Sequence, residues 1–217
     1  MKKNIKNFLI ILIIIFVLIF FLQLAYKTVR IGNNIDKSTD DLIEYILNLS
    51  SYEAKLEVTV NSNKTTNKYV LEQYYLEPNY SKQIVLEPTN LENMETIYDG
   101  NKLEIKNSNL GLSKIYEKYN YLNENLLWLN FFLDNCKENY YTVKENNEEI
   151  ILETNIEKYN YRGILYINKK SSKPIKIEIL DNNKQSKVYI EYKEIKLNNI
   201  QENNIFAFKL KDIKETV

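Results

Sequence analysis

Two pairs of neighbouring acidic residues, Asp40–Asp41 and Glu148–Glu149, are the side chains that general acid–base chemistry would use first. Such a mechanism needs two carboxyl groups that converge in a cleft and have different pKa values. Asp40 and Asp41 follow a serine at the expected start of a helix, and Glu148 and Glu149 belong to a polar turn. We therefore interpret both pairs as solvated surface groups. No serine, lysine or aspartate lies in a recognisable nucleophile motif.

Cys136 is the only cysteine, and the chain has no histidine. A cysteine nucleophile needs a group that lowers its pKa, and without histidine the usual activating base is missing. Imidazole is also the commonest metal ligand. Cys136 continues an apolar helical stripe with Leu129 and Leu133, so we expect a buried thiol. The four glycines have no spacing that is typical of a phosphate-binding loop. The sequence thus predicts a protein that is not an enzyme and that uses neither metal nor cofactor.

The apolar side chains of Leu127, Trp128, Phe131 and Phe132 are the candidate binding residues. Residues 121–136 are predicted to form a helix, and these four residues widen its apolar face to more than half of the helix circumference. A helix that is apolar on most sides is buried. These four side chains would either line an apolar groove for an acyl chain or fill the core without leaving a cavity. The sequence is compatible with both arrangements.

Three nearby tyrosines, Tyr116, Tyr119 and Tyr121, offer a second kind of binding surface. Their rings would stack on a glycan or a peptide if they lay together on the surface. The alternative is an edge strand or a loop that carries amphipathic tyrosines, and we favour this second interpretation.

The secondary structure that positions these residues is predicted from two kinds of spacing between apolar residues, one helical and one alternating. A serine at 38 and an acid at 41 predict a helix N-terminus, and apolar residues then recur at helical spacing to residue 49. After it, Tyr52, Ala54, Leu56 and Val58 alternate with polar residues, as in a strand with one buried face. The alternation recurs in about ten segments joined by short turns, and Asp99–Gly100 gives the strongest hairpin signal. We predict an α+β fold, an open antiparallel β-sheet of about ten strands in meander order, curled into a half-barrel with the helices over its concave face.

An apolar segment near the N-terminus, residues 8–22, predicts a membrane anchor represented by Phe8, Ile15 and Leu22. With one glutamine allowed it extends to residue 26, and a helix of that length measures about 28 Å, close to the thickness of a bilayer core. The apolar region of a signal peptide is usually shorter, about 7–15 residues. The segment is followed neither by a good cleavage site nor by the cysteine of a lipoprotein signal. We therefore expect an uncleaved anchor.

The charges around this segment predict how the chain is oriented. Lysines 2, 3 and 6 precede it without any acid, which favours a cytoplasmic N-terminus. The expected organisation is a cytoplasmic tip and transmembrane helix in residues 1–30, a tether in residues 31–37 and an extracytoplasmic domain in residues 38–217. The expected location is the cell membrane, in a single pass, with the domain on the outer side, in the cell envelope.

The charge of the domain excludes one class of partner. All 29 acidic residues lie beyond residue 30, with 24 of the 29 basic ones, so this part carries a net charge of −5. Nucleic-acid binding needs a concentrated basic surface, so we expect no nucleic-acid partner.

The order of these elements resembles the LolA/LolB-like lipoprotein-carrier superfamily, and most closely its Gram-positive branch of GerS-type germination lipoproteins. The resemblance spans residues 36–210. It rests on the Tyr-Asp-Gly turn at 98–100, the hairpin Tyr166–Lys176 with Pro174, and the strand Val188–Lys196, which leads to Asn198 and Phe206. The chain departs from the lipoprotein pattern because it lacks the lipid-modified cysteine.

The resemblance implies a non-enzymatic binding domain at the outer face of a membrane. In the carrier branch the concave face holds acyl chains, whereas a GerS-type protein supports a cortex-modifying amidase in spore germination. We therefore expect a membrane-anchored protein that supports germination through a protein partner such as a cortex amidase. The alternatives are a carrier or receptor for lipids or lipoprotein acyl chains, and a stress-sensing regulator of the envelope with the same fold. A permanently anchored carrier cannot ferry cargo between membranes, which favours the protein-binding role.

Overall fold

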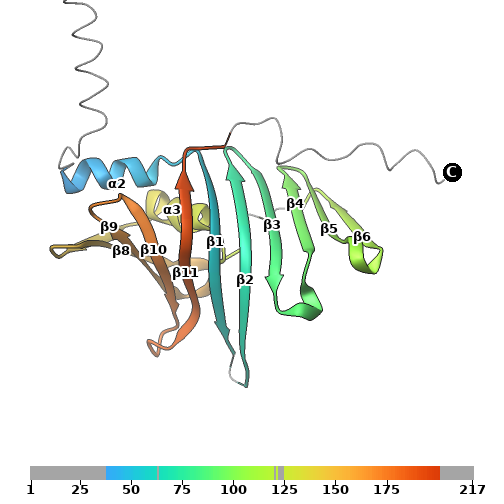
Figure 1. Cartoon of the computed structure of the whole chain (residues 1–217). Helices are drawn as coiled ribbons and strands as arrows, with labels where there is room; N and C mark the ends of the chain where they lie inside the picture. The colour runs from blue at the N-terminus through green and yellow to red at the C-terminus, as the bar shows by residue number, and fades with distance from the viewer. Residues whose placement is uncertain (1–37, 63, 120, 122–124, 201–217) are drawn as a thin grey trace, which may run out of the picture. The chain divides into compact units, whose positions relative to one another are not determined.

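The computed structural model describes residues 38–62, 64–119, 121 and 125–200 (Figure 1). Contacts divide the chain after Asp41, and the whole sheet lies in the part that begins at Leu42. The predicted anchor with Phe8, Ile15 and Leu22 and the C-terminal residues 201–217 lie outside the described residues. No helix within the described part has the length and the apolar content that crossing a bilayer requires.

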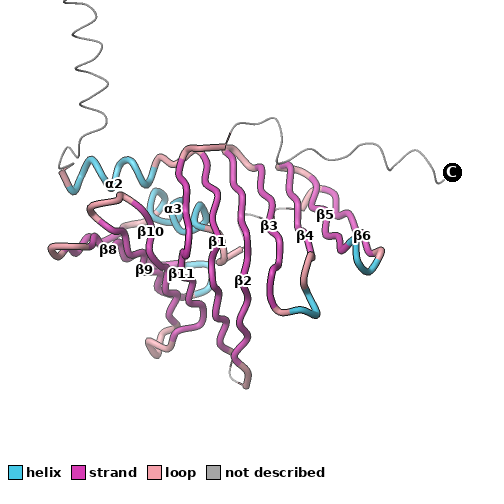
Figure 2. Tube along the Cα trace, viewed as in Figure 1, coloured by secondary structure: helices cyan, strands magenta, loops and turns pink. Residues whose placement is uncertain are grey.

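In the described part of the chain, eleven antiparallel strands form one open sheet. Its central strands lie side by side in Figure 2. The strands are β1 (Ser51–Asn61), β2 (Thr66–Leu76), β3 (Tyr80–Glu87), β4 (Met94–Asp99), β5 (Lys102–Asn107), β6 (Leu112–Glu117), β7 (Tyr141–Glu145), β8 (Glu149–Ile156), β9 (Tyr161–Asn168), β10 (Lys173–Leu180) and β11 (Ser186–Leu197). Among the described residues, short 3-10 helices connect some of the strands: η1 (Thr89–Leu91), η2 (Ser108–Leu110) and η4 (Glu157–Tyr159). The predicted open antiparallel sheet is confirmed, with one strand more than the approximate number expected.

The sheet is built from two meanders that meet at its centre. The order is β6-β5-β4-β3-β2-β1-β11-β10-β9-β8-β7, so the last strand lies beside the first. The two strands are antiparallel partners from Tyr52 opposite Leu197 to Val60 opposite Val188, with an irregularity between Lys55 and Leu56. A single meander in chain order was therefore an incomplete prediction, because it does not contain this central pair.

Alternating burial along the strands follows the alternation in the sequence. In β1, Tyr52, Ala54, Leu56 and Val58 are buried, whereas Lys55 and the other intervening charged residues face outward. A strand in a sheet with one covered face shows this period of two. The buried residues of all the central strands join one hydrophobic core on the same side of the sheet.

The turn at Asp99–Gly100 forms the predicted hairpin between β4 and β5. The carboxylate Oδ1 of Asp99 accepts hydrogen bonds from the backbone N–H groups of Asn101 and Lys102, at 2.9 and 2.7 Å. Gly100 has φ of +93°, a conformation that residues with a side chain rarely adopt. A short polar side chain and a glycine therefore fix this turn locally.

Helix α2 (Thr39–Leu47) begins as its sequence predicts. The Ser38 hydroxyl accepts a hydrogen bond from the backbone N–H of Asp41 at 3.2 Å, which caps an otherwise unsatisfied donor. Leu42, Ile43 and Ile46 are buried in the core, at the spacing of one helix face.

Helix α3 (Leu129–Glu138) is shorter than the predicted helix over 121–136, and this prediction was wrong at its start. The backbone before α3 turns instead, because the side chain of Asn125 accepts a hydrogen bond from the N–H of Leu127 at 3.0 Å. Trp128 is the N-cap residue and has an extended backbone, with φ of −99° and ψ of 133°. Residues 122–124 lie outside the described part.

Hydrogen bonds of Asn198 at one end of the sheet join the start of β1 to the end of β11. The side-chain oxygen of Asn198 accepts hydrogen bonds from the backbone N–H and the hydroxyl of Ser50, at 3.0 and 3.1 Å. The N–H of Asn198 donates to the Ser51 carbonyl at 2.8 Å. Asn198 adopts φ of +52°, a conformation that asparagine tolerates better than most residues. These bonds hold together two segments that are almost 150 residues apart in the chain.

Candidate functional site

The candidate site is centred on Trp128, which the loop before α3 presses against the apolar face of the sheet. Its side chain is fully buried, at 0% exposure. The indole lies 6.4 Å from the ring of Tyr52 and 6.2 Å from that of Tyr121, as measured between ring centroids. Tyr75 and Tyr98 extend the contacts outward, at 5.6 Å from Tyr52 and 5.9 Å from Tyr121. These five rings form what we call the aromatic cluster.

The aromatic cluster is held in place by a short network of buried polar groups. The Tyr52 hydroxyl donates to the side-chain oxygen of Gln73 at 3.3 Å and accepts from the N–H of Leu129 at 3.3 Å. The side-chain nitrogen of Gln73 donates to Gln83 at 3.0 Å and to the Leu127 carbonyl at 3.2 Å. The backbone on both sides of Trp128 is therefore bonded to the sheet.

Gln73 and Gln83 were not predicted from the sequence as site residues. Both are buried, at 0% and 9% exposure, and they lie opposite each other on β2 and β3. The signal was present, since Gln73 has the same phase as the buried Leu71 and Tyr75 on its strand. A glutamine in the apolar phase of a strand needs a hydrogen-bond partner once it is buried.

The other predicted groove residues lie around Trp128 but on different elements. Phe131 and Phe132 are on α3 and are buried, at 7% and 2% exposure, whereas Leu127 precedes the helix and is half-buried. Phe132 lies directly over Gly163 of β9, where a Cβ atom would come within 2.9 Å of the ring. The glycine thus makes the space that the aromatic ring occupies.

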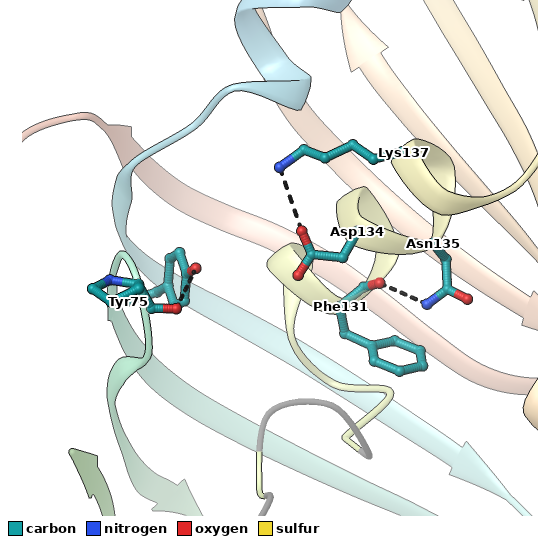
Figure 3. Close-up of polar contacts among 6 residues, drawn as sticks. Tyr75, Phe131, Asp134, Asn135 and Lys137 are labelled. Atoms are coloured by element: carbon teal, nitrogen blue, oxygen red, sulfur yellow. Dashed lines mark hydrogen bonds and ion pairs between the residues drawn. The ribbon is translucent and has the colours of Figure 1, made fainter. Parts of the chain in front are cut away.

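Figure 3 shows two charged groups of α3, Asp134 and Lys137, together with Tyr75 of the aromatic cluster. Lys137 pairs with the carboxylate of Asp134 at 3.4 Å, and the Asn135 amide donates to the Phe131 carbonyl at 2.8 Å. The Tyr75 hydroxyl donates to the carbonyl of Pro78 at 3.5 Å. Partial burial raises the pKa of Asp134, although Lys137 lowers it.

Burial disfavours the charged forms of Tyr52 and Cys136, two titratable groups inside the core. Burial raises the pKa of Tyr52 well above its ordinary value, and the nearby Tyr192 raises it further. The Cys136 thiol is buried at 1% exposure, as expected, and burial raises its pKa to about 12. A thiol in this environment is a small apolar side chain and not a nucleophile.

The candidate acidic residues occupy the places that the sequence predicts. Asp40 and Asp41 are exposed in the first turn of α2. Glu148 and Glu149 lie at the turn between β7 and β8, where both backbone N–H groups donate to the Asn146 side chain at 2.8 Å. Within the described residues, no three acidic or cysteine side chains are grouped so that they would hold a metal ion.

The three predicted surface tyrosines separate into different environments. Tyr116 lies on the edge strand β6, 6.0 Å from Tyr119 by ring centroids, whereas Tyr121 belongs to the aromatic cluster. The favoured interpretation, an edge strand or a loop with amphipathic tyrosines, therefore holds for Tyr116 and Tyr119 but not for Tyr121, which packs against Trp128.

The fold and the site define a domain in which an open antiparallel sheet carries a helix on its apolar face. The chain belongs to the family of YdcC-like sporulation proteins, whose family profile matches residues 5–206. This match agrees with the sporulation-related part of the resemblance that the sequence suggested. A comparison with curated protein sequences found no match.

Several solved structures are similar to the chain. A conserved protein from Thermus thermophilus has a TM-score of 0.53 at 12% identity and covers 81% of this chain and 96% of its own. A structure of the CwlD amidase from Clostridioides difficile in complex with the GerS lipoprotein gives 28% identity and a TM-score of 0.46, with coverage of 75% and 95%. A LolA superfamily protein from Nitrosomonas europaea gives 12% identity and a TM-score of 0.43, with coverage of 79% and 98%.

Proposed function

We propose that this protein is a non-enzymatic binding domain that serves sporulation or germination through a protein partner. In this proposal, the segment of residues 8–22 anchors it to the cell membrane and the domain lies outside the cytoplasm. Membership of the YdcC-like sporulation family supports the biological process. The resemblance to GerS-type proteins makes a cortex amidase the first partner to test.

The observation that carries this proposal is where the large apolar side chains lie. A lipid carrier would need Trp128 and Phe131 to line an open groove, whereas a protein-binding domain would fill its core and expose apolar residues elsewhere. Trp128 is fully buried and packs on Tyr52 and Tyr121, and Phe132 lies against Gly163. Large apolar side chains are instead exposed at the two edges of the sheet. This distribution favours a protein partner.

The experiment is native mass spectrometry of the full chain, released from detergent, alone and with the cortex amidase of the same bacterium. We expect a stoichiometric complex with the amidase and no bound lipid on the free chain. A one-to-one adduct with the mass of a phospholipid or fatty acid, without an amidase complex, would replace the proposal with the carrier function. Hydrolysis of cortex peptidoglycan by the chain alone would contradict the non-enzymatic part.

A further inference from the structure

The strand β6 ends the sheet on one side and has an unusual surface for an edge strand. Within the described residues, β5 pairs with one side of β6 and no strand pairs with the other. The backbone N–H and C=O groups on the outer side of an edge strand are a template for another strand. Proteins usually protect such an edge with charges, bulges or a covering segment.

Exposed apolar side chains gather at β6 instead. Leu112 and Ile115 project from opposite faces of the strand and are 61% and 48% exposed. Leu110, the last residue of η2, is 62% exposed, and Tyr119 beyond the strand is 44% exposed. Four of the six large apolar residues that the described part exposes thus lie within ten consecutive positions.

The opposite edge strand, β7, is protected in the usual way. Both of its charged residues form ion pairs: Lys144 with Glu153 on β8 at 3.4 Å, and Glu145 with Lys169, just after β9, at 2.9 Å. Val143 is its only exposed large apolar side chain, at 43%, and Tyr140 lies before the strand. The two edges of one sheet therefore differ in a way that the fold does not require.

The charges near β6 indicate what kind of segment would fit. Lys114 on the strand and Lys118 beyond it form no ion pair with an acidic side chain of the described residues. The ammonium of Lys114 lies 4.8 Å from the centre of the Tyr116 ring. The ion pair of β6 itself is Lys102 with Glu117, at 3.5 Å. Although the domain is acidic overall, these two lysines near β6 are therefore available to pair with acidic side chains of a partner.

We propose that β6 is the docking edge for the protein partner, which adds an extended acidic segment as a further strand. Backbone hydrogen bonds to the free side of β6 would give affinity, as in other complexes formed by strand addition. One apolar residue of the segment would cover Leu112 on one face of the sheet, and another, an odd number of positions away, would cover Ile115 on the other face. Acidic residues of the segment would pair with Lys114 and Lys118. This inference rests on the proposed function and specifies its contact surface.

The test measures binding of the full chain in detergent to the cortex amidase of the same bacterium by biolayer interferometry. Ile115→Asp places a carboxylate on β6, and Val143→Asp is the matched control on the other edge strand. We expect about tenfold weaker binding or more for Ile115→Asp and Leu112→Asp, and unchanged binding for Val143→Asp. Each variant is compared only if its unfolding free energy matches that of the wild type.

The outcomes separate the two proposals. If the wild type does not bind the amidase, the proposed partner is wrong and the docking edge falls with it. If the wild type binds and Ile115→Asp binds equally well, the partner stands and the docking edge is overturned. Hydrogen exchange gives a second readout: amides of residues 112–117 must be unprotected on their outer side in the free chain and protected in the complex. Protection in the free chain, by its own residues or by a second copy, would also overturn the inference.

Discussion

The hydroxyl of Tyr52, on the first strand, accepts a hydrogen bond from the backbone N–H of Leu129 at the start of α3, over 3.3 Å. Trp128, the N-cap residue, provides no side-chain cap for this helix. A residue 77 positions earlier in the chain therefore performs the capping function that a local serine or aspartate usually has. The position at which α3 begins is thus determined by tertiary contact.

Replacement of Tyr52 by phenylalanine should destabilise the domain. The change removes the hydroxyl that accepts from the Leu129 N–H and that donates to the side-chain oxygen of Gln73. The ring contacts with Tyr75 and Trp128 persist. We expect a loss of about 1–3 kcal/mol in the free energy of unfolding, measured by urea denaturation.

Tyr75→Phe is the matched control for this experiment. Its hydroxyl makes one long hydrogen bond, at 3.5 Å, to the carbonyl of Pro78. The control should therefore lose less stability than Tyr52→Phe. Equal losses would show that the cap and the glutamine contact contribute little.

Gly163→Ala should disturb the packing of α3 against the sheet. The added methyl group would come within 2.9 Å of the Phe132 ring and within 3.2 Å of Ile156, and the tightly packed core has little room to move. Overpacking of this kind costs about 1–3 kcal/mol, which thermal and urea unfolding would detect.

The double variant Gly163→Ala/Phe132→Leu tests the cause of that loss. Leucine removes the ring atoms that the methyl group meets, so the alanine should cost less in this background than in the wild type. Identical costs in both backgrounds would mean that the glycine is needed for another reason.

Asp134 predicts a defined pH dependence of stability. Burial raises the pKa of this carboxyl in the folded state, so the folded protein disfavours its charged form. The resulting destabilisation is absent below the ordinary pKa of an aspartate, grows between that value and the raised folded-state pKa, and is complete above the folded-state pKa. We expect Asp134→Asn to be more stable than the wild type at pH 7 and equal to it at strongly acidic pH. A variant that is less stable at pH 7 would show that the ion pair with Lys137 outweighs the burial.

Cys136 should not react with thiol reagents in the native state. With a pKa of about 12 and 1% exposure, its thiolate is both scarce and inaccessible at pH 8. Mass spectrometry after reaction with iodoacetamide should show no label in the folded chain and one label in urea. Rapid labelling of the folded chain would mean that α3 leaves the sheet readily.

Features that depend on neighbouring residues in the chain were predictable. The cap of α2 by Ser38, the turn at Asp99 and Gly100, and the alternation along β1 all follow from local patterns and agree with the structure. The open antiparallel sheet followed from repetition of that alternation.

Features that depend on distant contacts were not predictable in the same way. Nothing in the sequence of β11 indicates that it pairs with β1, because any half-buried strand satisfies the same pattern. The start of α3 depends on Asn125 and on Tyr52, and the latter belongs to another element. Trp128 and Phe131 are buried, as a helix apolar on most sides predicts. The strand phase of Gln73 indicated burial, but its pairing with Gln83 became visible only with the strand register.

The pairing of β1 with β11 also bears on how the domain acquires its structure during synthesis. The central pair joins residues about 130 positions apart or more, so the chain must close a very long loop before the middle of the sheet exists. Topologies dominated by such distant pairings fold slowly. Until the final strand emerges, the inner edge of β1 is unpaired and resembles the sites at which chains aggregate. Chaperones that shield exposed strands would therefore matter most for this protein just before its last strand is released.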